Sequence, residues 1–150
     1  MDIVADIRAA ILAQMSTTLG ADYQVLPFVF TEDRNDARRG KLAYNCRPLG
    51  ASPSEGQVNR SFTEDQGFEM ILSDTFAVDV TDVQKLASID VMFDKADEIM
   101  KAIVSTKLGL SAVVLFVSSP SYSEPELLRG AKMVLLRIQF IVKYRTQIAT

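Results

Sequence analysis

The sequence contains no histidine and only one cysteine, Cys46, among its 150 residues. The missing histidine excludes Ser-His-Asp and Cys-His nucleophilic arrangements, and it excludes HExxH and Cys2His2 zinc sites. A single cysteine excludes multi-cysteine metal sites and an internal disulfide. No Ser-x-x-Lys, GxGxxG or GxxxxGK[ST] motif is present, so no serine–lysine pair or phosphate-binding loop is supported. We therefore expect no catalytic residues and no metal or cofactor.

Long apolar runs and strong positive charge are also missing. No apolar stretch approaches the ~18–20 residues that a membrane-spanning helix needs, and the first residues lack the pattern of a signal peptide. The net charge of −3 argues against nucleic-acid binding through overall charge. With 48% hydrophobic residues, the composition is that of one globular domain over residues 1–150, in a reducing compartment by default.

Two stretches have the apolar spacing of amphipathic helices. Residues 3–19 carry isoleucine, methionine or leucine at every fourth position, and Gly20 follows as a stop signal. A second helix is predicted over 82–108, because Thr81 and Gln84 have the spacing of a capping box and Gly109 can end it. The apolar stripe expected to face the core of this second helix comprises Leu86, Ile89, Phe93, Ala96, Met100 and Ile103.

Alternating apolar residues predict strands over 23–30, 41–47, 68–80 and 132–144. We expect the first two to form an extended β-hairpin, and 48–59, rich in proline and glycine, to be a mobile surface loop. The unbroken apolar run 113–117 predicts a central strand covered on both faces. The fold class is therefore α+β: a mainly antiparallel sheet of about five strands, with two long helices packed on one face.

The final predicted strand, 132–144, is longer than most strands and matches 68–80 in length. At about 3.3 Å per residue it would span roughly 40 Å, so it either bends or runs past the edge of its domain. Alternation places Val134, Leu136, Ile138, Phe140, Val142 and Tyr144 on its inner face. In the other long strand, Asp74 interrupts the apolar face, and we interpret it as the point where that strand leaves the core. Cys46 falls on an apolar strand face, which indicates a small buried hydrophobe.

Charge is distributed in blocks along the sequence. Residues 34–60 contain six basic and two acidic residues, 64–98 contain two basic and ten acidic, and 129–150 contain five basic and none acidic. Solvated faces are one explanation. The other is a pair of complementary patches that join identical subunits head to tail. The candidate interface residues are Arg34, Arg38, Arg39, Asp79, Asp82, Asp94, Asp97, Arg137 and Lys143.

Paired carboxylates on the second helix are the remaining candidates for chemistry. Asp94 and Glu98 are spaced i,i+4, with Asp97 between them, and such a group could bind Mg²⁺ or act as acid and base. Lys95 and Lys101 interleave with them on the side opposite the apolar stripe, which favours a solvated helix face.

The order of elements resembles that of tail-terminator proteins of long-tailed bacteriophages, also called tail-completion or neck proteins. The resemblance lies in an initial amphipathic helix, a hairpin, a long alternating strand, a helix reading VMFDKADEIMKAIVSTKLG and a last strand reading KMVLLRIQFIVKYR. It covers most of the chain and involves no short motif.

This resemblance implies a non-enzymatic virion protein that is assembled in the host cytoplasm. The family forms a hexameric ring that caps the tail tube, docks onto the head connector and lets DNA pass through its lumen without sequence-specific binding. Two alternatives remain open. One is another head–tail connector component, such as a stopper or tube subunit; the other is a ligand-binding or enzymatic α+β domain with a pocket under the 48–59 loop.

Overall fold

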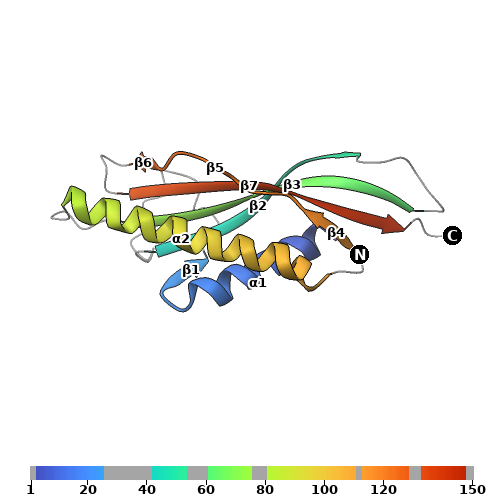
Figure 1. Cartoon of the computed structure of the whole chain (residues 1–150), viewed down its shortest axis with the longest axis horizontal. Coiled ribbons are helices and arrows are strands. Elements are labelled where there is room, and N and C mark those ends of the chain that lie inside the picture. Colours follow the sequence, from blue (N-terminus) through green and yellow to red (C-terminus); the bar gives the residue numbers. More distant parts are fainter. Residues whose placement is uncertain are drawn as a thin grey trace.

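In the computed structural model, helices form one layer and a single sheet forms the other (Figure 1). The described residues are 3–25, 42–53, 61–75, 81–110, 113–128 and 133–147. Both helices lie on the same face of the sheet, which confirms the predicted α+β class. The elements in chain order are α1 (Ile3–Leu19), β1 (Tyr23–Val25), β2 (Leu42–Pro53), β3 (Ser61–Thr75), α2 (Asp82–Thr106), a 3-10 turn η1 (Lys107–Gly109), β4 (Val114–Val117), β5 (Ser121–Tyr122), β6 (Glu126–Leu128) and β7 (Met133–Gln147).

The sheet is organised around the pairing of β3 with β7. These two strands run antiparallel over 15 residues, from Ser61↔Gln147 to Thr75↔Met133. The strand order is β1-β2-β3-β7-β4, and β5 and β6 also pair with β7. Because β4, β5 and β6 meet successive parts of β7, they form one interrupted strand along the edge opposite β3. Figure 1 shows β3 and β7 continuing past both helices at the end of the sheet where β7 finishes.

The predicted hairpin between 23–30 and 41–47 is wrong. β1 runs parallel to β2, with Tyr23 opposite Leu42 and Val25 opposite Tyr44, and a hairpin requires antiparallel strands. Hydrophobic alternation fixes which face a side chain takes but carries no information on strand direction. The long hairpin is instead formed by β2 and β3, which pair antiparallel. Residues 26–41, which include the predicted hairpin tip, lie outside the described residues.

The predicted loop over 48–59 is also wrong in its first half, because β2 continues to Pro53. A register shift between Pro48 and Ala51 lets the strand pass through this segment as a bulge. Among the described residues, β1 pairs with β2 as far as Tyr44. Beyond that residue, the second edge of β2 is open in the part of the chain that the structure describes, so a proline there interrupts no pairing. Residues 54–60 are not among the described ones.

The apolar run 113–117 does not form a central strand. β4 lies at the sheet edge and pairs only with β7, with a register shift between Val114 and Phe116. Val114 and Val117 are buried, whereas Phe116 is 56% exposed. A short apolar run predicts burial of part of a strand, but it cannot distinguish a central position from an edge packed against a helix.

Both helices begin or end where local chemistry predicts. α1 has the predicted bounds, and Gly20, at a φ of 78°, donates its N–H to the carbonyl of Ser16. The capping box at the start of α2 is confirmed: Gln84 N donates to Thr81 Oγ1 at 3.2 Å, and Thr81 N donates to Gln84 Oε1 at 3.0 Å. α2 ends at Thr106, two residues earlier than predicted, because Lys107 and Leu108 adopt positive φ values of 50° and 61°.

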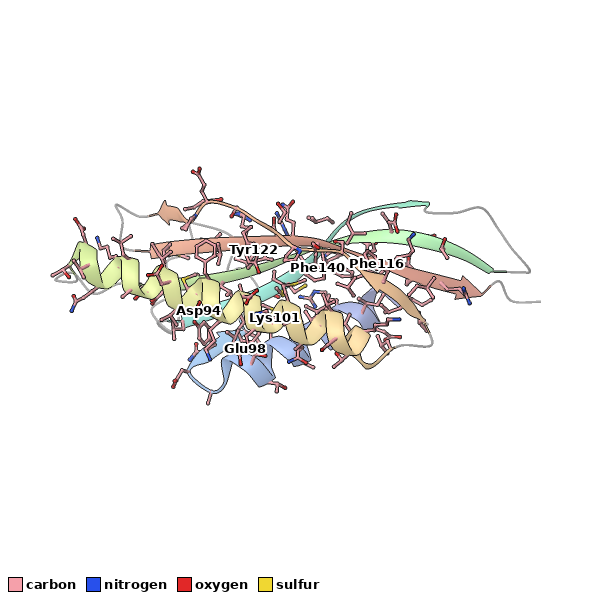
Figure 2. The ribbon with its side chains drawn as sticks, in the orientation of Figure 1. Asp94, Glu98, Lys101, Phe116, Tyr122 and Phe140 are labelled. Atoms are coloured by element: carbon pink, nitrogen blue, oxygen red, sulfur yellow. The ribbon has the colours of Figure 1, made fainter. Side chains whose placement is uncertain are left out.

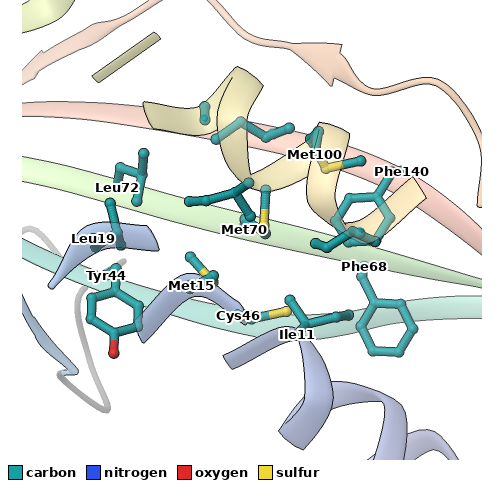
Figure 3. Packing of buried hydrophobic residues seen from close by; sticks show 14 of the residues in the cluster. Ile11, Met15, Leu19, Tyr44, Cys46, Phe68, Met70, Leu72, Met100 and Phe140 are labelled. Carbon is teal, nitrogen blue, oxygen red and sulfur yellow. The ribbon is translucent and has the colours of Figure 1, made fainter. Parts of the chain in front are cut away.

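The main core fills the space between the helices and one face of the sheet (Figure 3). The rings of Phe68 and Phe140 stack there with centroids 6.1 Å apart. All six predicted inner-face residues of β7 are buried, which confirms the alternation in that strand. Cys46 also lies in this core, and burial raises the pKa of its thiol to about 12. Asp74 is itself buried, at 3% exposure, and residues 76–80, which would show whether the strand leaves the core after it, lie outside the described residues.

Candidate subunit interface

Four of the nine predicted interface residues, Arg34, Arg38, Arg39 and Asp79, lie outside the described residues. The remaining five fall on two surfaces. Asp82, Asp94 and Asp97 lie on α2, whereas Arg137 and Lys143 lie on β7 and face away from the helices.

The three aspartates of α2 are exposed on the outer side of the helix. Asp97 pairs with Lys101, with 2.8 Å between Oδ2 and Nζ, and this hydrogen bond raises the pKa of Lys101. Figure 2 labels Asp94, Glu98 and Lys101 along this helix. Within the described ranges, no group of three acidic, cysteine or histidine side chains could hold a metal ion. The arrangement is that of a solvated, charged helix face.

Arg137 belongs to an ionic cluster on the far face of the sheet. The cluster is centred on Glu69 of β3, which is 1% exposed. Glu69 Oε1 lies 2.8 Å from Arg47 Nη2 and 3.1 Å from Arg137 Nη1, and Oε2 accepts a 2.8 Å hydrogen bond from Gln139 Nε2. Arg137 Nε lies 3.1 Å from Glu126 Oε1. Sequence reasoning missed this cluster because it depends on the register that places Arg47, Glu69 and Gln139 side by side.

The rest of this far face is mixed in character. Towards the start of β7, Met133 and Leu135 are fully buried and form a second, smaller apolar cluster with Ala43 and Ile71. Further along β7, Ile141 is 45% exposed. Lys143 is half-buried and lies opposite Asp65 in the register.

Large apolar side chains are exposed at the N-terminal end of α2. Val83 is 76% and Leu86 62% exposed. Leu86 was predicted to face the core, and that prediction is wrong. In Figure 1 the first turns of α2 reach beyond the ends of β6 and β7, so none of the described strands lies beneath them. The stripe becomes partly buried at Ile89 and Phe93, and the ring of Phe93 lies 5.8 Å from that of Tyr122.

A second exposed apolar surface is a groove between α2 and β4, with a volume of about 410 Å³. Met100 and Val117 are nearly buried within it, whereas Val104 is 46% and Phe116 56% exposed. Asp97, Lys101, Ser105, Ser119 and Pro120 complete the lining. Periodicity gave no signal for this groove, because it forms between elements that are distant in the sequence.

A hollow of about 430 Å³ on the far face lies beside the bulge of β2, near the place where the sequence suggested a ligand pocket. Leu49 and Ile141 give it apolar walls, and Ser118, Ser119, Ser121, Asp65 and Gln139 provide polar groups. Asp65 Oδ1 is buried and has no hydrogen-bond partner among the residues that the structure describes.

The described helices include none that is long and apolar enough to cross a membrane. Comparison with protein-family models and with curated proteins finds no match to this sequence.

Proposed function

We propose that this protein is a non-catalytic structural subunit of a long-tailed bacteriophage virion. In this role it assembles in the host cytoplasm into a hexameric ring at the neck. The ring caps the tail tube, docks onto the head connector and lets DNA pass through its lumen without reading the DNA sequence.

The observation that carries this proposal is the presence of two different exposed apolar surfaces on one chain. One is the projecting end of α2 at Val83 and Leu86, and the other is the groove at Val104 and Phe116. A ring of identical subunits needs two unlike surfaces on each subunit, because every contact in it joins one patch to a different patch. Exposed apolar patches rimmed by polar residues are typical of protein interaction sites.

The order and length of the elements support the tail-terminator assignment in particular. An initial helix, two long paired strands and a second long helix match parts of the pattern on which the resemblance rests. The hairpin expected between 23–30 and 41–47 does not match, because β1 and β2 run parallel. β3 and β7 extend past the helices, which leaves a projecting part of the sheet available for a neighbouring protein.

The proposal is tested by mass photometry and by negative-stain images of the purified protein, alone and with tail tubes from the same phage. We expect a particle of six times the 16.6 kDa chain mass and ring-shaped class averages, with rings on the head-proximal ends of the tubes. A protein that remains a 16.6 kDa monomer and leaves tube ends bare at saturating concentration would contradict the proposal.

The hollow beside the β2 bulge favours a second candidate, a small-ligand-binding domain. Its volume lies within the usual range of ligand sites, ~300–1,000 Å³. In that case a metabolite mixture would contain a compound that raises the melting temperature saturably. Asp65→Asn would abolish that shift, whereas the ring proposal requires no such ligand.

A further inference from the structure

The N-terminal end of α2 carries an apolar projection, which we call the knob and define as Val83 and Leu86. These residues are three positions apart and therefore neighbours on the helix surface. The capping box of Thr81 and Gln84 satisfies backbone groups in this first turn, and this stabilises the turn although no strand in the described part of the chain packs on it. Ile89 continues the apolar side of the knob towards the core.

The groove between α2 and β4 is concave, whereas the knob projects from the surface. Met100 and Val117 are 2% and 5% exposed within it, while Val104 and Phe116 stay open to solvent. Its walls come from one helix and one edge strand, which both belong to the main core. An aliphatic side chain that enters this groove would cover Val104 and Phe116, and burial of apolar surface contributes about 25 cal/mol per Å².

Charge also differs between the two ends of α2. Asp82 and Asp90 are exposed beside the knob, and Lys85 there is half-buried with a partner within the chain. At the other end, Asp97 and Lys101 both line the groove and pair with each other, and Lys107 is exposed just after the helix. An approach of the knob to the groove therefore brings Asp82 and Asp90 towards the unlike charge of Lys107.

The two surfaces cannot meet within one chain. Val83 and Val104 are 21 positions apart on one continuous helix, which separates them by roughly 30 Å at 1.5 Å per residue. A contact between them joins two copies of the chain. Because the surfaces differ, the contact is heterologous: it closes into a ring if the rotation allows and otherwise continues as a filament.

We infer that the knob of one copy inserts into the groove of the next, so that Val83 and Leu86 of one chain pack against Val104 and Phe116 of another. This inference rests on the proposed ring function and names the surfaces that would build the ring.

The test uses one variant that blocks each surface. Leu86→Glu disables the knob and keeps the groove, whereas Phe116→Glu disables the groove and keeps the knob. Both positions are exposed, so the monomer fold should tolerate the change, and circular dichroism checks this. If Phe116→Glu does not fold, Val104→Glu blocks the same groove from the helix side.

We expect each variant alone to lose all assembly beyond the monomer. An equimolar mixture still offers one intact knob–groove contact, so native mass spectrometry should show a heterodimer and nothing larger. Val91→Glu is the matched control: Val91 is 50% exposed on the same helix but faces a hollow beside Leu19 and Tyr23. This control should assemble like the unmodified protein.

Normal assembly of both blocking variants would overturn the inference and leave the ring function standing, since the ring would then use other surfaces. Full-size particles from the mixture would also overturn it. If the unmodified protein shows no self-association at any concentration, the inference fails, and the tube-capping experiment decides separately on the proposed function.

Discussion

Glu69 on β3 and Arg137 on β7 form an ion pair on the face of the sheet that the helices leave uncovered, with 3.1 Å between Oε1 and Nη1. The carboxylate is almost completely buried, and Arg47 and Gln139 also bind it. Because Arg47 belongs to β2, the Glu69 carboxylate links side chains of three neighbouring strands, β2, β3 and β7.

Replacing that carboxylate should destabilise the protein. Glu69→Gln leaves two guanidinium groups without their shared partner, and breaking a buried pair costs about 3–5 kcal/mol. Since the side chain of Arg47 is 43% exposed, water replaces part of the interaction. We expect a loss of about 2 kcal/mol in the free energy of unfolding, measured by urea titration. Glu126→Gln is the control: this carboxylate is 44% exposed and should cost less than about 1 kcal/mol. Equal losses of unfolding free energy in Glu69→Gln and Glu126→Gln would show that the burial of Glu69 adds nothing to the stability contributed by its ion pairs.

The capping box of α2 should contribute measurably to local stability. Thr81→Ala removes the acceptor for Gln84 N, and loss of such a cap costs about 1 kcal/mol. Amide hydrogen exchange over the first two turns of α2 should accelerate, while exchange near Ala96 stays unchanged. The matched control is Thr17→Ala on α1, where an exposed threonine bonds only the Ala13 carbonyl. Alanine has the higher helix propensity, so this control should be neutral or slightly stabilising. Unchanged exchange in Thr81→Ala would contradict the role of the cap.

Gly67 should not tolerate a side chain. A Cβ atom there would lie 3.1 Å from Leu49 Cβ and 3.4 Å from the Gly50 carbonyl oxygen, because the β2 bulge passes close to β3 at this point. Gly67→Ala should destabilise by about 1–3 kcal/mol in thermal or urea unfolding. Gly50→Ala, where a Cβ would meet nothing within 4 Å, should leave stability nearly unchanged. The opposite order of effects would mean that the bulge moves freely away from β3.

Stability should fall at alkaline pH. Burial raises the pKa of the Cys46 thiol from 9.0 to about 12, and the unfolded chain therefore releases this proton first. The stability that the protonated Cys46 thiol contributes to the folded state is fully present below pH 9. It is lost as the pH rises towards 12, at up to ~1.4 kcal/mol per pH unit. Burial also raises the pKa of Tyr23, with a further contribution from Asp74, and adds to the same trend.

Urea titrations at pH 8, 9 and 10.5 measure this slope. Cys46→Ala should be less stable than the unmodified protein at pH 8, because it leaves a cavity, but it should lose less stability between pH 9 and 10.5. Parallel pH dependence in the two proteins would contradict the assignment to Cys46.

Local rules predicted much of this fold, because they act within a few residues. The bounds of α1, the Thr81 cap and the inner face of β7 all depend on spacings that the sequence shows directly. Pairing direction does not: β1 and β2 have the same alternation whether they run parallel or antiparallel. The length of β2 was underestimated for a related reason, since a proline is compatible with a strand whose second edge has no pairing partner there among the described residues.

The candidate interface was less accessible to sequence reasoning. Leu86 is exposed because the first turns of α2 reach beyond the ends of β6 and β7. Helix periodicity predicts the apolar side of a helix, but it does not predict where the sheet beneath that helix ends. The groove at Phe116 and the Glu69 cluster arise from elements far apart in the chain, so no local pattern marks them. Asp82 lies beside Val83 and Asp97 lines the groove. Their predicted contact with Arg34, Arg38 and Arg39 stays a prediction, because these arginines lie outside the described residues.

The position of β7 has a consequence for synthesis in the cell. β3 leaves the ribosome long before its partner, since Thr75 pairs with Met133 and Ser61 with Gln147. Until β7 emerges, the nascent β2–β3 hairpin has a bare hydrogen-bonding edge and an uncovered apolar face. Contacts this distant in the sequence also slow folding. The newly made chain should therefore depend on chaperones that bind extended apolar segments, and premature termination before β7 should yield aggregates and no partly folded domain.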